Sequence, residues 1–415
     1  MRPTLYAWAA LLSVMLASSV AVSRAARANT WNVTPDGGGD APTIQAAIDA
    51  ASAGDSIVLA SGTYTWTAQG GDHVGLPGPS MLNMRSGLTL RSELGPELTI
   101  LDAEGNGRVI RCQSISNVRI EGLTIQGGNA DAPGLSGQFS MGVGGAILCK
   151  FGSSIVIANN VLRNNRSKFN GSGVGLNLSS SEVVGNVICW NIGDFGLYIA
   201  GGSAEVRGNT VASNTGGGVG YCQAQGSFSQ NLILDTSGGY DLWCCDANVA
   251  MTCNDVWGDP SATTCTLGEG NIAEDPLVCI TSGEFHVQPD SPCLAENNDC
   301  GVLLGARGLG CTATDVVEAS PPRAGVWVAA SPSPFNPQTR IVYTLDPTVE
   351  HVQLVVFDLR GRLVKRLLDA SVSSAGGMVT WNGTDEQGVP VGAGIYIAAL
   401  DTGSYVATAK LVLVK

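Results

Sequence analysis

A short repeat constrains this chain more than any other feature of its sequence. Five segments share the pattern apolar-x-x-Asn-x-apolar, and successive copies are 22 to 26 residues apart. Their Asn residues are Asn160, Asn186, Asn209, Asn231 and Asn254. An earlier copy carries Leu123 in place of the Asn. A second Asn follows three of the copies five residues later, at Asn165, Asn191 and Asn214.

Units of this length hold short β-rich runs and polar turns, so neighbouring units have to stack to form a core. Residues at equal positions then lie about 4.8 Å apart, the spacing between strands. Stacked Asn side chains can bond to one another, and Asn tolerates left-handed turns. The L-x-x-L-x-L frame of leucine-rich repeats is absent, and 55 Gly residues indicate many tight turns. The repeat therefore predicts an all-β solenoid.

A helical pattern precedes the repeats. Within residues 42–51, Ile44, Ala47, Ile48 and Ala51 have helical spacing, and Gly54 ends the pattern. With the repeats, this entry resembles the right-handed parallel β-helix proteins of the pectate-lyase-like superfamily. The resemblance covers about residues 29–312 and implies a helix that caps the N-terminal end. It implies no single activity, because that superfamily contains lyases, hydrolases, esterases and non-enzymes.

Residues 1–28 predict a secretory signal peptide. Arg2 gives a positive start, and Leu5 to Val22 is almost wholly apolar. Ala26-Arg27-Ala28 is a small-x-small cleavage site. The alternative is a membrane anchor, but no stop-transfer signal follows. Cleavage would leave 19 basic and 35 acidic residues, a balance of −16, which argues against a nucleic-acid partner because phosphate binding needs clustered Lys and Arg.

Twelve Cys residues in an exported chain predict disulfides. The positions of Cys residues within the units place some of them on neighbouring strands, at a separation that a disulfide accepts. The candidate pairs are Cys112 with Cys149, Cys222 with Cys245, and Cys244 with Cys265. The alternative is a stack of buried free thiols. The pairing of Cys279, Cys293, Cys300 and Cys311, and the state of Cys189 and Cys253, cannot be deduced from the sequence.

The last part of the chain differs in composition. Pro-rich residues 313–334 predict a linker. Alternating runs that start at Ile341, Val352, Gly394 and Ala409 predict a small antiparallel sandwich over residues 335–415. This segment carries seven basic and seven acidic residues, so the negative charge falls on the solenoid.

Four short motifs accompany these runs. They are Ser333-Pro334-Phe335-Asn336-Pro337, Phe357-Asp358-Leu359-Arg360-Gly361, Trp381-Asn382-Gly383-Thr384-Asp385 and Gly394-Ile395-Tyr396. On these motifs the segment resembles the Ig-like C-terminal sorting domains of bacterial type IX secretion and the hook-capping-type Ig domain. The resemblance implies export by outer-membrane secretion machinery, followed by release or surface attachment. Asn382 departs from the Asp often found in that family, and a plain accessory sandwich is the alternative.

Three ionisable residues share one position in consecutive units. Asp131, Lys168 and Asp194 each follow the Asn position, or Leu123, by eight residues. If the turns match, two carboxylates flank an ammonium, an arrangement that could bind Ca²⁺ or assist proton transfer. The three are the candidate catalytic residues, and the two Asp residues are the candidate calcium ligands. A surface ion-pair ladder of little energetic value is the alternative.

A short apolar strand, usually led by Gly, lies between successive Asn copies. Alternation along this strand predicts which side chains face out of the solenoid. The outward positions are Leu148, Asn177, Tyr198, Gly220 and Trp243. Tyr198 and Trp243 could stack on sugar rings, and Asn177 and Asp241 could bind sugar hydroxyls. The alternative is that a loop or the C-terminal domain covers the aromatic rings, since exposed large aromatics normally have a reason.

Common catalytic signatures are missing from the sequence. No G-x-S-x-G, H-E-x-x-H or P-loop occurs, and the chain has only three His residues. We therefore expect a secreted or cell-surface β-helix protein, a monomer, that recognises extracellular polysaccharide. The alternative is a polysaccharide lyase that acts by Ca²⁺-assisted β-elimination, or a glycoside hydrolase.

Overall fold

The computed structural model describes the solenoid and most of the C-terminal domain. The described residues are 28–71, 79–131, 143–234, 237–258, 264–281, 284–310, 327–331, 335–345, 349, 351–358, 362–371, 376–402 and 406–414. Nearly all of the predicted signal peptide lies outside them, as do residues 132–142, Cys311, most of the predicted linker and Ser333-Pro334.

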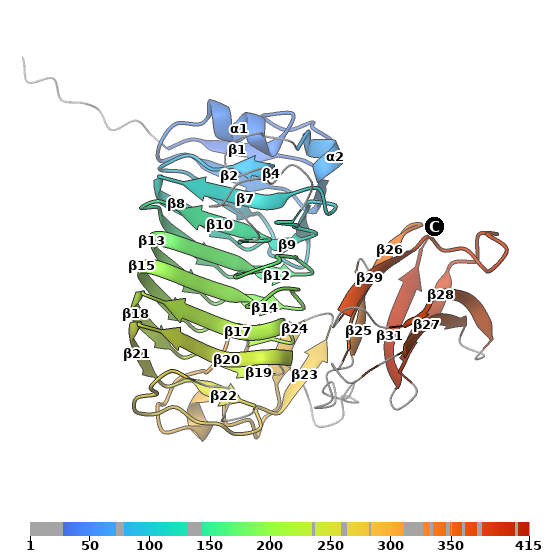
Figure 1. Cartoon of the computed structure of the whole chain (residues 1–415). Coiled ribbons are helices and arrows are strands. Elements are labelled where there is room, and N and C mark those ends of the chain that lie inside the picture. The colour runs from blue at the N-terminus through green and yellow to red at the C-terminus, as the bar shows by residue number, and fades with distance from the viewer. Residues whose placement is uncertain are drawn as a thin grey trace, which may run out of the picture.

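Short strands coil around a common axis and form three parallel faces (Figure 1). The first face contains β4 (Ser80–Asn83), β7 (Arg108–Gln113), β10 (Ile147–Lys150), the start of β13 (Val174–Val184) and of β15 (Leu197–Arg207), β17 (Thr215–Cys222) and β20 (Ser237–Cys245). The second face contains β1 (Thr30–Val33), β2 (Ser56–Leu59), β5 (Thr89–Ser92), β8 (Ser116–Glu121), β11 (Ser154–Ala158), the ends of β13 and β15, β18 (Gln225–Ser229) and β21 (Asn248–Thr252). The third face contains β3 (Gly62–Thr65), β6 (Thr99–Asp102), β9 (Thr124–Gln126), β12 (Val161–Arg163), β14 (Val187–Cys189), β16 (Thr210–Ala212), β19 (Leu232–Leu234) and β22 (Asp255–Trp257). The chain thus has the predicted parallel β-helix fold.

The core of the solenoid consists of inward side chains stacked strand upon strand. On the first face, Cys112, Cys149, Leu176, Ile199 and Tyr221 follow one another in register and are fully buried. Burial of such stacks removes apolar surface from water at about 25 cal/mol per Å². Every unit depends on its neighbours for this burial, which is why the repeat and the fold go together.

The Asn positions form two internal ladders. The backbone N and the Nδ2 of Asn160 lie 3.0 and 3.1 Å from Oδ1 of Asn186. In the second ladder, both distances from Asn165 to Oδ1 of Asn191 are 3.0 Å. The backbone N–H of Leu123 donates to Oδ1 of Asn160 at 3.0 Å, so Leu123 occupies the ladder position assigned to it.

The expected left-handed geometry belongs to a different residue. The ladder Asn residues are not among the described residues with positive φ; the residue before each of them is. These preceding residues are Asn159, Gly185, Gly208, Gln230 and Cys253 in the first ladder, and Asn164, Trp190 and Ser213 in the second. The ladder positions therefore require Asn for its amide, which accepts from one unit and donates to the next.

Helix α1 (Ile44–Ala50) closes the N-terminal end, as predicted (Figure 1). The Thr43 hydroxyl accepts from the backbone N of Ala46 at 3.2 Å and caps the first turn. Ile44, Ala47 and Ile48 are buried against the first units. A second short helix, α2 (Trp66–Gln69), precedes the first face.

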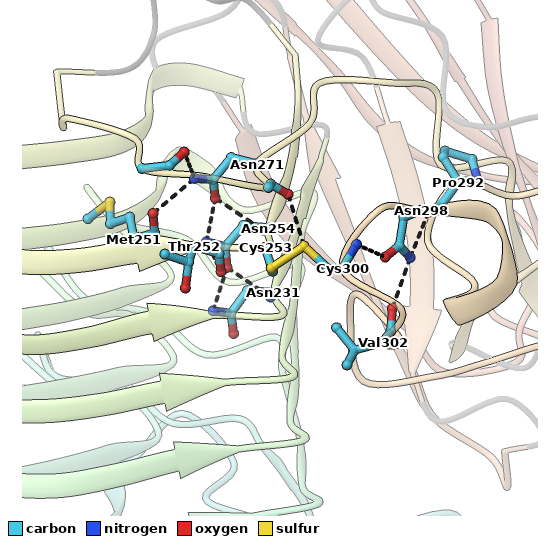
Figure 2. The surroundings of a disulfide bond; sticks show 12 residues. Asn231, Met251, Thr252, Cys253, Asn254, Asn271, Pro292, Asn298, Cys300 and Val302 are labelled. Atoms are coloured by element: carbon cyan, nitrogen blue, oxygen red, sulfur yellow. Dashed lines mark hydrogen bonds between the residues drawn. A yellow bond between two sulfur atoms is a disulfide. The ribbon is translucent and has the colours of Figure 1, made fainter.

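The C-terminal end of the solenoid is closed by an irregular cap. It contains the antiparallel pair β23 (Val278–Thr281) and β24 (Glu284–Val287) and a 3₁₀ turn, Ala295–Asn297. Asn271 extends the first ladder beyond the last repeat, with its Oδ1 3.0 and 2.8 Å from N and Nδ2 of Asn254. Figure 2 shows how the Cys253–Cys300 disulfide joins this ladder end to the cap.

Two of the three predicted disulfide pairs are present. Cys222 bonds to Cys245, and Cys244 bonds to Cys265. Cys112 and Cys149 lie opposite each other in register, but both are free and buried, so this third prediction is wrong. Their thiols meet through a hydrogen bond, and with burial this raises the pKa of Cys112 well above its ordinary value. The strand register places two Cys residues opposite each other on adjacent strands, but it does not determine whether they form a disulfide.

The remaining Cys residues take several states. Cys253 pairs with Cys300, as noted above, and Cys279 is also disulfide-bonded. Cys189 and Cys293 are buried and form no disulfide.

The C-terminal domain is an antiparallel sandwich. One sheet contains β25 (Trp327–Ser331), β26 (Thr339–Thr344) and β29 (Gly376–Trp381). The other contains β28 (Leu363–Ser371), β27 (His351–Asp358), β30 (Gly394–Asp401) and β31 (Val406–Leu413). Strand β25 falls within the segment predicted to be a linker and pairs with β26, so the sandwich begins earlier than expected.

The aromatic residues of the sandwich motifs meet in its core. Trp381 is fully buried, with its ring centroid 5.5 Å from that of Phe335 and 5.1 Å from that of Tyr396. The sandwich also contacts the third face of the solenoid, where Nη1 of Arg340 lies 3.3 Å from Oδ1 of Asp102. A cavity of about 80 Å³ lies at this contact, lined by Asn129, Asn164, Arg340 and Met378 among others.

Candidate functional site

Three aromatic rings gather on the outer surface of the first face. The centroids of Phe195 and Tyr198 are 5.8 Å apart, those of Phe195 and Trp243 are 5.8 Å apart, and those of Tyr198 and Trp243 are 6.4 Å apart. The ring planes are inclined by only 20 to 27°, so the rings stack. We call Phe195, Tyr198 and Trp243 the aromatic cluster. Such near-parallel rings offer apolar faces with polar edges.

Gly220 makes room for the aromatic cluster. It lies in register between Tyr198 on β15 and Trp243 on β20. A Cβ at position 220 would lie 2.8 Å from Cδ2 of Tyr198 and 3.1 Å from Cδ2 of Phe195. The missing side chain therefore lets the Phe195 ring fill the gap between the two flanking rings, and Phe195 itself is 8% exposed.

Tyr198 and Trp243 were expected to face outward, and both are partly exposed. The sequence analysis left open whether a loop or the C-terminal domain covers the aromatic rings. The residue that packs on them is Phe195, in the turn before β15. One signal for Phe195 was present in the sequence, since it directly precedes Gly196, the Gly that leads its strand.

Asp194 lies at the edge of the aromatic cluster, one residue before Phe195. Its backbone N donates to the carbonyl O of Phe169 at 3.1 Å, which fixes the turn, while the residue remains exposed. Partial burial raises the pKa of the Asp194 carboxyl above its ordinary value. Burial, and the Asp194 charge, also raise the pKa of the Tyr198 hydroxyl, so the two groups are electrostatic neighbours.

The three ionisable residues of the predicted ladder follow bridged positions of three consecutive units. Bridges join Asn129 to Arg166 and Arg166 to Ile192, two residues before Asp131, Lys168 and Asp194. The register shifts beyond the second bridge, because the backbone N of Asp194 donates to the carbonyl O of Phe169 rather than to that of Ser167. Asp131 accepts the backbone N–H of Lys168 at 2.7 Å. Its other oxygen lies 3.4 Å from Nε of Arg166, in an exposed ion pair.

The side chains of this ladder do not converge on one point. The Lys168 ammonium lies 5.5 Å from the ring centroid of Phe169 rather than between the two carboxylates. Among the described residues, no three acidic, His or Cys side chains lie close enough to hold a metal ion. The ladder thus matches the ion-pair alternative more closely than the calcium site, and Asp131 and Asp194 remain only untested candidates for metal binding.

Two expected sugar contacts are placed differently. Asp241 is 3% exposed, so its carboxyl is not available to a ligand at the surface. Asn177 is in register with Ala200 and Cys222, two residues along the strands from the aromatic cluster. Leu148, also expected to face outward, is fully buried. Alternation along a strand predicts which face a side chain takes, but not what folds over that face.

A group of cations lies on the first face beyond these residues, and sequence reasoning missed it. Arg108 is fully buried, and Lys150 is 3% exposed. Burial lowers the pKa of Lys150 to about 8, and the charge of Arg108 acts in the same direction. Burial also lowers the pKa of Arg108 to about 10, with Arg111 contributing. Strand alternation alone places Lys150 outward and gives no hint of its burial, while Arg111 is half-buried.

Comparisons with known proteins give little beyond the fold. No family model and no curated protein matches the sequence. Dimeric latent PorU from Porphyromonas gingivalis is 21% identical over 21% of this chain and 9% of its own, with a TM-score of 0.18. Jun a 1, the major allergen from cedar pollen, is 14% identical over 60% of this chain and 78% of its own, with a TM-score of 0.35. The β-helix assignment rests on the strand register, and neither structure bears on the site.

In the described part of the chain, no helix combines the length and the apolar character needed to cross a membrane.

Proposed function

We propose that this chain is an exported protein that binds extracellular polysaccharide on the first face of its β-helix. The observation that carries the proposal is the aromatic cluster, whose partly exposed rings of Tyr198 and Trp243 flank a buried Phe195. Sugar rings present apolar C–H faces, which stack on such side chains, while their hydroxyls bond to polar groups at the edge. Asp194 supplies such a group.

Export is part of the proposal. It is supported by the disulfides Cys222–Cys245, Cys244–Cys265 and Cys253–Cys300, because disulfides persist in oxidising compartments. We propose that the sandwich serves in sorting or attachment, as its resemblance to secretion domains implies. A truncation that removes residues 327–415 should then leave the protein inside the producing bacterium, and normal export of that truncation would contradict the sorting role.

The binding proposal is tested by affinity electrophoresis of purified protein through gels that contain plant, algal or bacterial polysaccharides. Retardation by at least one polymer is expected. It should be lost in Trp243→Ala and kept in Trp243→Phe, because Phe retains the aromatic face. Trp257→Ala, on the third face, is the matched control and should behave as the unchanged protein. Absence of retardation by every polymer would contradict the proposal.

A polysaccharide lyase is the second candidate, and one observation favours it. Burial and the charge of Arg108 lower the pKa of Lys150 to about 8, close to the value that suits a general base at neutral pH. Its burial separates it from the surface where a polymer would lie. Release of unsaturated products from a polyuronate, abolished in Lys150→Ala and unaffected by Trp243→Ala, would favour the enzyme over the binding protein.

A further inference from the structure

Acidic residues of the turn series lie near the aromatic cluster, together with Arg166 and Lys168 of the intervening unit. Asp194 borders the aromatic cluster directly, and Asp131 lies two units away in the same turn position. No ion pair involves Asp194 among the described residues; the nearest register neighbour that could neutralise it, Lys168, has its ammonium over the Phe169 ring. The solenoid carries nearly all of the protein's excess negative charge.

The cations of the first face lie elsewhere. Arg111 is in register with Leu148, Gly175 and then Tyr198, so three strand spacings, roughly 14 Å, separate its position from the aromatic cluster. That distance exceeds the Debye length of about 8 Å at physiological salt. Arg108 and Lys150 are buried as well. Asp194 is therefore the charge that acts most directly on the rings, since it raises the pKa of the Tyr198 hydroxyl.

We propose that the aromatic cluster selects uncharged polysaccharide and rejects polyuronates, and that Asp194 is the residue that determines this specificity. This inference rests on the proposed function. A carboxylate at the rim of an aromatic platform accepts hydrogen bonds from neutral sugar hydroxyls, and such charge-assisted bonds are roughly twice as strong as neutral ones. A uronate carboxylate in the same place meets a like charge, and like-charge juxtaposition discriminates between partners.

The partial burial of Asp194 strengthens both effects. Its pKa is raised by desolvation, which means that the carboxylate is less hydrated than an ordinary surface Asp. A poorly hydrated carboxylate loses less hydration free energy when a sugar hydroxyl replaces its water. Its charge also acts through less solvent, so a second negative charge is repelled more strongly.

The test compares each neutral polymer with its own C6-oxidised form, so that only the carboxylate differs. Full-length protein is run through gels that contain β-glucan, glucomannan or galactan, or the oxidised form of each. We expect retardation by at least one neutral polymer and about tenfold weaker binding of its oxidised form. Asp194→Asn should weaken neutral binding by about tenfold, the loss when a charge-assisted hydrogen bond becomes neutral, and should remove most of the discrimination.

The outcomes separate this inference from the proposed function. If the oxidised polymers bind as well as the neutral ones, or if Asp194→Asn leaves the ratio of the two affinities unchanged, the specificity inference is overturned while binding stands. Glu205→Gln is the matched control, because it removes an exposed carboxylate at the end of β15, on the second face and away from the rings, and it should preserve the ratio. If no polymer of either kind binds, both the proposed function and the inference fail.

Discussion

Asn231 gives both of its inward N–H groups to one atom of Asn254. The backbone N and the side-chain Nδ2 of Asn231 lie 2.9 and 3.0 Å from Oδ1 of Asn254. Asn231 in turn accepts the same two bonds from Asn209, each at 2.9 Å. Each buried amide is thereby satisfied by the next, so the ladder is a continuous polar network inside the solenoid.

Asn231→Ala should lower the free energy of unfolding by about 2 to 5 kcal/mol, because it leaves the buried backbone N–H of Asn209 without its acceptor and removes one of the acceptors of the Asn209 amide. Urea denaturation followed by circular dichroism measures the loss. Asn248→Ala, at an exposed position on the neighbouring strand β21, is the control and should change stability by less than about 0.5 kcal/mol. Equal stability of the two variants would show that the ladder contributes nothing.

The fold was predictable because its unit is repeated. Each Asn marks the same corner of a coil, so the interval between copies fixes register, and register fixes which residues stack. The prediction failed where the chain stops repeating. Asn271 continues the ladder from an irregular segment, and β25 pairs with β26 within the expected linker. Neither carries a periodic signal, since the contact of Asn271 with Asn254 and the pairing of β25 with β26 each occur outside the repeats.

Joint replacement of Cys253 and Cys300 by Ser should loosen the C-terminal cap. Their disulfide spans 47 residues and ties the last ladder turn to the cap, so its loss should cost about 3 kcal/mol. Hydrogen exchange should rise in residues 264–310 and stay unchanged in residues 80–131, at the other end of the solenoid. Replacement of exposed Asp299 by Ser is the control. Uniform exchange along both regions would contradict a local role for this bond.

The candidate site was predictable in part. Tyr198 and Trp243 were found because outward positions follow from the Gly-led strands, and Asp194 because it repeats in the turn series. Their convergence was not predictable, because it depends on Phe195, a turn residue that folds over Gly220. The prediction that Asp241 contacts sugar hydroxyls failed for a similar reason. Its burial depends on neighbouring segments of the chain that the strand pattern does not reveal.

Gly220→Ala should weaken polysaccharide binding several-fold while the protein stays folded. The added methyl group would lie 2.8 Å from Cδ2 of Tyr198, closer than a Cβ can approach, so the rings must move apart. Affinity electrophoresis measures the change. Gly392→Ala in the sandwich, where a Cβ would meet nothing within 4 Å, is the control. Unchanged affinity in Gly220→Ala would mean that the ring spacing does not matter for binding.

The stability of the C-terminal end should fall as the pH rises from about 4 to about 7. Asp255 is fully buried, and burial raises the pKa of its carboxyl to about 7, with the charges of Glu274 and Asp275 adding to the shift. Because its folded-state pKa lies above the unfolded value of 3.8, the folded state holds the proton more tightly. Below about pH 4 both states are protonated. Above it the unfolded state ionises first, and stability declines until the folded carboxyl has ionised too.

Asp255→Asn tests this directly. The Asn amide keeps an acceptor for the backbone N–H of Glu274, which lies 3.3 Å from Oδ1, and it cannot ionise. We expect the variant to lose the decline between pH 4 and 7 and to be more stable than the unchanged protein at pH 8, by up to about 4 kcal/mol. Thermal unfolding at a series of pH values measures both effects. Asp275→Asn, which removes a neighbouring exposed charge, should keep most of the decline, and a decline that persists in Asp255→Asn would assign it to another group.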